Sequence, residues 1–160
     1  MLGIVSGFLL AVGLSACSGG NGDGQSGEEA TQSGAFETAQ SGEISLETLG
    51  GVWNLTHIST KGEEAREVTD ISMTVDEADG KYMVEDGCNN PRGTFEVVGG
   101  TVTSSPVIVT RMACVDDGVA TNEDTITAVL SEIASATLSN GSQLQIASGA
   151  GVLVFEREGE

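Results

Sequence analysis

Two cysteines are the residues of this chain whose type and placing are best suited to chemistry. Cys88 lies in the segment DGCNNPRGTF, and Cys114 ends the segment TRMAC. Two such thiols can join in a disulfide bond, stay reduced as small core residues, or form a reactive or metal-binding pair. The first possibility is a structural cross-link and the third is an active centre, so the surrounding residues have to decide between them.

The ligands for a metal centre are too few. Structural zinc is held by four Cys or His side chains, usually with pairs at short spacing such as C-x2-C. The chain has three cysteines and one histidine, His57, and its first cysteine, Cys17, has another use described below. The acidic stretches VDEAD and CVDDGVATNED lack the order of oxygen ligands of an EF-hand calcium loop. We therefore predict no metal site and interpret these stretches as solvated turns.

Nucleophilic catalysis is also poorly supported. Cys88 would need a base, and His57 lies in the predicted strand WNLTHIS, with no identifiable third group to orient it. The chain has no G-x-S-x-G motif and no phosphate-binding loop. We predict no catalytic residue, no cofactor and no enzymatic activity. Arg92 and Arg111, each beside a cysteine motif, are expected to pair with neighbouring acids, with a binding role as the alternative.

The amino-terminal segment indicates export. An apolar run from Leu2 to Leu14 is too short to cross a bilayer and has about the length of a signal-peptide core. The residues LSAC that follow resemble the lipobox of bacterial lipoproteins, so residues 1–16 are predicted to be a signal peptide and Cys17 the site of lipid attachment. The segment before the apolar run has no Lys or Arg, and we expect the true translation start to lie upstream of Met1.

Residues 17–43 are rich in Gly, Ser and acidic side chains. Such a segment cannot bury enough apolar surface to offset the entropy of ordering it, so it is predicted to be a flexible tether. The protein is expected to be lipid-anchored to a bacterial membrane through Cys17 and to face outside the cytoplasm. Because thiols within reach of one another oxidise there, the disulfide between Cys88 and Cys114 is the favoured interpretation.

Charge excludes several classes of partner. The 160 residues carry 24 Asp and Glu against 6 Lys and Arg, a formal net charge of -18, and only 4% of them are aromatic. This field repels phosphate backbones and anionic lipid surfaces, and stacking platforms for bases are scarce. We predict no nucleic-acid partner. The length suits one folded domain, placed at residues 44–160.

The domain is predicted to be mainly β. Short segments with two-residue alternation are separated by the turn dipeptides Asp79-Gly80, Gly99-Gly100 and Asn140-Gly141. About eight strands at this spacing indicate an antiparallel sheet, curved or closed into a barrel.

One segment, TNEDTITAVLSEIASA, breaks this rhythm. Its residues Ile126, Val129, Leu130 and Ile133 form one apolar stripe of a helix. Thr121 or Asn122 is expected to cap this helix, which would lie across the concave face of the sheet.

Several motifs in order carry a family resemblance. The segments LGGVWNL, GCNNPRGTFEVVGG, TRMAC and LQIASGAGVLVFER resemble the META domain, which is found in HslJ-like heat-shock lipoproteins. The resemblance covers about Leu46 to Arg157. It implies a barrel-like antiparallel sheet around one helix, an association with envelope stress and drug tolerance, and no established catalytic activity.

These observations predict a lipid-anchored, non-enzymatic envelope protein that acts by binding a partner, which can be another envelope protein. Two alternatives stay open. One is a module that inhibits a protease or another enzyme through an exposed hairpin. The other is a carrier of a small apolar ligand, held between helix and sheet in a cavity lined by Ile126, Val129 and Ile133.

Overall fold

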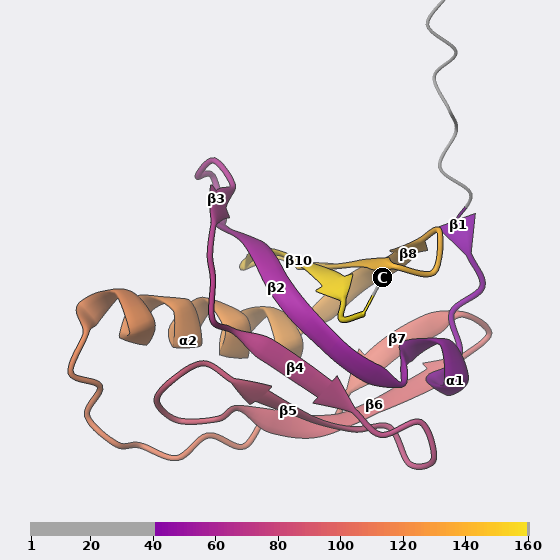
Figure 1. Cartoon of the computed structure of the whole chain (residues 1–160), viewed down its shortest axis with the longest axis horizontal. Coiled ribbons are helices and arrows are strands. Elements are labelled where there is room, and N and C mark those ends of the chain that lie inside the picture. The colour runs from indigo at the N-terminus through magenta and orange to yellow at the C-terminus, as the bar shows by residue number, and fades with distance from the viewer. Residues whose placement is uncertain (1–40, 160) are drawn as a thin grey trace, which may run out of the picture. The chain divides into compact units, whose positions relative to one another are not determined.

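A computed structural model describes residues 41–159 (Figure 1). The predicted signal peptide, Cys17 and all but the last three residues of the predicted tether lie outside the described residues. Within residues 41–159, no helix has the length and apolar character needed to cross a membrane.

Ten strands and two helices make up the described part of the chain. The helices are α1 (Leu46–Leu49) and α2 (Asp117–Ser131). The strands are β1 (Ser41–Gly42), β2 (Gly51–Thr60), β3 (Arg66–Glu67), β4 (Ser72–Val75), β5 (Lys81–Glu85), β6 (Arg92–Val98), β7 (Thr101–Ser104), β8 (Ile133–Ser139), β9 (Gln143–Ser148) and β10 (Gly151–Arg157).

The strands form one antiparallel sheet that curls into a half-barrel (Figure 1). Their order is β1-β8-β9-β10-β2-β4-β5-β6-β7, and β3 pairs with β2 outside this path. The sheet curls far enough for β7 to contact β8. Helix α2 packs on β2, β9 and β10. The predicted fold, a curved antiparallel sheet with one main helix, is therefore confirmed.

Two hairpin turns follow directly from their dipeptides. Gly99 and Gly100 have φ of 57° and 80°, and Asn140 and Gly141 have φ of 51° and 74°. Positive φ at both central positions is what a type I′ turn requires, and its twist matches that of the flanking strands. These turns set the registers of β6 with β7 and of β8 with β9.

Helix α2 begins and ends earlier than predicted. Its N-cap is Asp116, whose Oδ1 accepts hydrogen bonds from the backbone N–H groups of Gly118 at 2.7 Å and Val119 at 3.3 Å. The predicted caps Thr121 and Asn122 are therefore wrong, because an acidic side chain upstream already satisfies the free N–H groups. Ile133, the last member of the predicted stripe, lies in β8 instead.

The space between α2 and the sheet is filled by side chains. Ile126, Val129 and Leu130 have no exposed surface, and they share one core cluster with Trp53 and Phe155. Ile133 is only partly buried. The residues expected to line a ligand cavity are thus part of the packed core.

Arg157, at the end of β10, closes one end of the sheet. Its guanidinium lies 4.2 Å from the centre of the Trp53 ring. It donates hydrogen bonds to the backbone oxygens of Thr48, Gly50 and Gly141, at 2.5, 2.7 and 3.0 Å. These contacts together are called the Arg157 clasp below. They join the last turn of α1 and the β8–β9 turn to β10.

Candidate functional site

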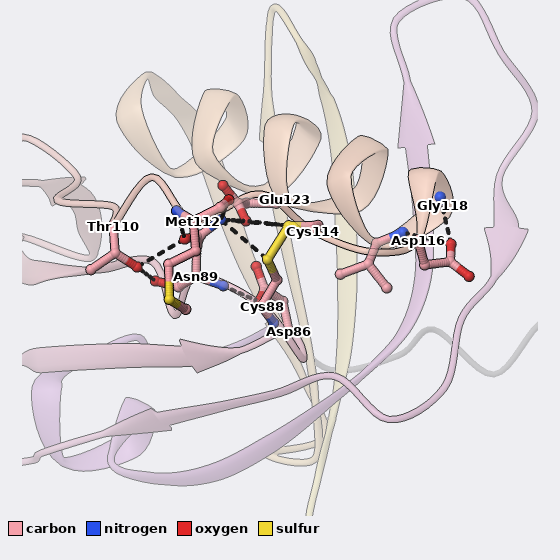
Figure 2. The surroundings of a disulfide bond; sticks show 10 residues. Asp86, Cys88, Asn89, Thr110, Met112, Cys114, Asp116, Gly118 and Glu123 are labelled. Carbon is pink, nitrogen blue, oxygen red and sulfur yellow. Dashed lines mark hydrogen bonds between the residues drawn. A yellow bond between two sulfur atoms is a disulfide. The ribbon is translucent and has the colours of Figure 1, made fainter.

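A disulfide bond joins Cys88 to Cys114, the state that the sequence favours for this pair (Figure 2). Their Cα atoms are 5.8 Å apart. The bond connects the turn between β5 and β6 with residues 105–116, which run from β7 to α2 and are called the bridging loop below.

Asp86 shapes the turn that carries Cys88. Its side chain is 3% exposed, and its Oδ1 accepts hydrogen bonds from the backbone N–H groups of Cys88 at 2.8 Å and Asn89 at 3.1 Å. The next residue, Asn90, has φ of 49°, a left-handed conformation that asparagine tolerates better than most residues. The turn therefore holds Cys88 and Asn89 in fixed positions before β6 begins.

Asn89 connects this turn to two other segments (Figure 2). Its Oδ1 accepts from Thr110 Oγ1 at 2.9 Å and from the Met112 N–H at 2.8 Å. Its Nδ2 donates to the Met112 backbone oxygen at 3.1 Å and to Glu123 Oε2 at 2.8 Å. This one side chain therefore holds both the bridging loop and α2 in place.

Both sulfurs lie near Glu123, and the three groups could be mistaken for a metal site. Their ligand atoms lie within 4.8 Å of one another. Metals bind cysteine as thiolate, however, and here both sulfurs are bonded to each other. The Asn89 Nδ2 group also contacts all three, at 3.3 and 3.5 Å from the sulfurs and 2.8 Å from Glu123 Oε2. While the disulfide is formed, the group of Cys88, Cys114 and Glu123 is therefore a structural contact and not a metal site.

His57 is not brought to Cys88. Its Nδ1 lies 3.1 Å from Thr56 Oγ1, and its Nε2 lies 4.0 Å from Glu67 Oε1, across the β2–β3 pair. Its side chain is 43% exposed, as expected for a strand residue. The described residues therefore assemble no Cys–His pair.

The bridging loop exposes apolar side chains. Five large hydrophobic residues are exposed within residues 41–159, and three of them, Ile108 at 60%, Met112 at 62% and Val115 at 105%, belong to this loop. The other two are Met83 in β5 and Val98 in β6. The sequence reveals the apolar letters of this loop but not their exposure, because alternation in SSPVIVTRMACV fits a buried strand equally well.

The side chains of Arg92 and Arg111 are both exposed. The ion pairs among the described residues are His57–Glu67 and Lys81–Asp79, and neither includes these arginines. Their expected pairing with neighbouring acids is thus not found in the described part of the chain. Two of the protein's 6 basic residues therefore have no acidic partner within residues 41–159, and each lies beside an exposed apolar side chain, Arg92 by Ile108 and Arg111 by Met112.

A cleft of about 550 Å³ separates the bridging loop from α2. The loop contributes Val109, Arg111 and Met112 to its walls, and α2 contributes Glu123, Asp124, Thr127 and Ala128. Because α2 packs on β2, β9 and β10 with its buried face, this flank of the helix is left to face the loop. The cleft depends on contacts between distant segments, and the sequence alone does not reveal it.

Comparisons with known proteins relate the chain to a family and to solved folds. The family model of the META domain matches residues 45–160. The chain resembles a protein from Burkholderia xenovorans solved by NMR, with 21% identity and a TM-score of 0.59, over 72% of this chain and 87% of that one. A second protein solved by NMR has 22% identity and a TM-score of 0.58, over 71% and 95%. The search of curated proteins produced no match.

Proposed function

Because the chain belongs to the META domain family, we propose that it is a lipid-anchored protein of the cell envelope that acts by binding a partner and not by catalysis. Lipid on Cys17 would hold it at the membrane, as the LSAC segment suggests. A role in envelope stress or drug tolerance follows from the family resemblance seen in the sequence.

The observation that carries this proposal is the apolar face of the bridging loop. Single exposed apolar residues are common and need no explanation. Three large ones within eight residues of one loop are more informative, because apolar surface that gathers in one segment marks interaction sites. Ile108, Met112 and Val115 therefore form the surface where a partner would gain most from burial.

This surface is held in place before any partner binds. The loop is fastened at Cys114 by the disulfide, at Thr110 and Met112 by Asn89, and at Ile108 by two backbone hydrogen bonds to Arg92, of 3.0 and 2.8 Å. Asp116 ends it as the N-cap of α2. A pre-ordered loop loses little conformational entropy on association, so more of the contact energy appears as affinity.

The groups that could do chemistry are already engaged in the structure. Both sulfurs are bonded to each other, and Asn89 and Glu123 bond to one another beside them. This arrangement supports binding as the function of the site.

Photo-crosslinking in intact cells tests the proposal. A photoreactive residue at Met112 should give one discrete crosslinked species. The matched control is Val98, which is 78% exposed but lies outside the bridging loop, and should not give that species. Equal crosslinking at both positions, or none at Ile108, Met112 and Val115, would show that the bridging loop is not the binding surface.

A further inference from the structure

We propose that the cleft between the bridging loop and α2 binds an extended segment of the partner, which adds as a β-strand to the free edge of the loop. This inference rests on the proposed function and specifies how the partner is recognised. It starts from the backbone of the loop and not from its exposed side chains.

The bridging loop has an unpaired strand edge at Val107 and Val109. Ile108 exchanges both backbone hydrogen bonds with Arg92, as an antiparallel pair does. In such a ladder, the N–H and C=O groups of the residues on either side point to the opposite edge. Neither Val107 nor Val109 has a backbone hydrogen-bond partner within residues 41–159. Their polar groups are therefore available to another strand.

The free edge meets the cleft. Val109 lines it, and the small side chains Thr127 and Ala128 of α2 form part of the opposite wall. Strands pair at about 4.8 Å, so a segment paired with Val109 would lie between the loop and the helix. A volume of about 550 Å³ is in the range of ligand sites, roughly 300 to 1,000 Å³. Addition of a strand to an exposed sheet edge is a general mode of peptide recognition in which backbone hydrogen bonds supply affinity.

The wall of the cleft carries spare polar groups. Thr121, Thr125 and Ser131 of α2 each donate a hydroxyl hydrogen bond to the backbone oxygen four residues earlier. Thr127 is the exception, because its Oγ1 is buried and has no hydrogen-bond partner within residues 41–159. Arg111 on the loop and Asp124 on the helix line the cleft, and neither belongs to an ion pair among the described residues. These groups suit a peptide better than a purely apolar ligand.

The net charge indicates whether the strand that binds in the cleft comes from a second copy of this chain or from a different protein. Two copies, each with a net charge of -18, repel one another, so pairing of two free edges is disfavoured. The same field attracts a basic partner and accelerates its approach. The inferred occupant is therefore an extended segment, rich in β-branched residues and flanked by Lys or Arg.

A synthetic peptide tests this directly with the full chain. The probe is KVTVTVK, and its matched control carries N-methyl groups on alternate residues, which removes the amide donors along one edge and keeps the side chains. Binding of the probe should slow hydrogen exchange of the Val107 and Val109 amides by about tenfold or more, as expected for newly bonded amides. The N-methylated peptide should leave both amides unchanged.

Two variants locate the binding. Thr127→Leu fills the cleft and should weaken probe binding by about tenfold or more. Thr121→Leu makes the same change at an exposed position of α2 and should leave binding unchanged. The unfolding midpoints of both variants are measured as well. A variant that loses binding but keeps its midpoint has lost the site and not the fold.

Three outcomes overturn strand addition: equal binding of the two peptides, exchange protection elsewhere than at Val107 and Val109, or full binding by the Thr127→Leu variant. If the probe fails while Met112 still crosslinks a single partner, the proposed function stands and only the mode of recognition is wrong. If the crosslinking fails as well, both are rejected.

Discussion

The side-chain amide of Asn89 donates a hydrogen bond of 2.8 Å to Glu123 Oε2 and so ties the turn after β5 to α2. The same side chain holds Thr110 and Met112 of the bridging loop. Three segments that are distant in sequence thus depend on one buried amide, and the predictions below begin with it.

Asn89→Ala should destabilise the fold by about 2–4 kcal/mol, because it leaves several buried or half-buried polar groups without partners. The matched control is Asn122→Ala, which removes one exposed contact with Arg66 and should change stability by less than about 0.5 kcal/mol. Urea unfolding with the disulfide intact measures both. Similar midpoints for the two variants would contradict the role given to Asn89.

Replacing both Cys88 and Cys114 by Ala should cost about 3.5 kcal/mol, the chain-entropy estimate for a closed loop of about 27 residues. Reduction of the wild-type protein should lower its thermal midpoint in the same direction. Thiol titration of the unreduced, denatured protein provides the check. Two free thiols at these positions would rule out the disulfide in the native protein.

Tyr82 should titrate above its ordinary range. Burial raises the pKa of its phenol, and the hydrogen bond with Ser104 Oγ partly offsets that rise. Because the pKa is higher in the folded protein, the associated stability is complete below the unfolded value of about 10 and is lost as pH rises through the folded value.

The titration can be followed without ambiguity, since the chain has one tyrosine. Phenolate absorbance should rise at higher pH in the folded protein than in the urea-unfolded chain. Ser104→Ala should shift the folded curve further upward. A folded curve that coincides with the unfolded one would contradict the burial of Tyr82.

Arg157→Lys should destabilise the protein by about 1–3 kcal/mol, because lysine keeps the charge but cannot donate to three carbonyl oxygens from one planar group. Arg66→Lys, which disturbs one exposed contact with Asn122, is the matched control. Fluorescence of Trp53, the one tryptophan, reports the change locally. Equal stability of the two variants would argue against the Arg157 clasp.

Cys17→Ser should move the protein from the membrane fraction to the soluble extracellular or periplasmic fraction, since one thiol is proposed to carry the anchor. The domain itself should keep its unfolding midpoint. Fractionation and mass spectrometry of the amino terminus measure the outcome. Retention of the variant in the membrane fraction would refute anchoring through this residue.

The strands were predictable because their signals are local. Asn140-Gly141 and Gly99-Gly100 set two hairpins through backbone conformation alone, and alternation in SMTV and KYMVE places Met73 and Val84 in the core. Three residues of the apolar stripe, Ile126, Val129 and Leu130, were predictable from their spacing, whereas Ile133 lies in β8. The start of α2 was not predictable, because Asp116 competes with Thr121 as a cap and local patterns rank such candidates poorly.

The site itself was largely beyond prediction. Asn89 meets Thr110 and Glu123 only because the curled sheet brings the β5–β6 turn to the first half of α2. The unpaired edge at Val109 is a property of how β6 and the bridging loop pair, which the letters PVIVT do not reveal. The cysteines did point to this region, since two thiols in a protein that is expected to be exported favour a cross-link.

The join between β1 and the rest of the domain has a mechanical consequence. Force transmitted from the amino-terminal side first reaches β1, which is held to β8 only by the pairs Ser41–Ser139 and Gly42–Leu138. Such a short edge strand would peel away under a small load. The next element in line is α1, which is held by its capping box and by the Arg157 clasp on Thr48 and Gly50. Arg157 would then act as the stop that prevents tension on the proposed anchor from unravelling the sheet.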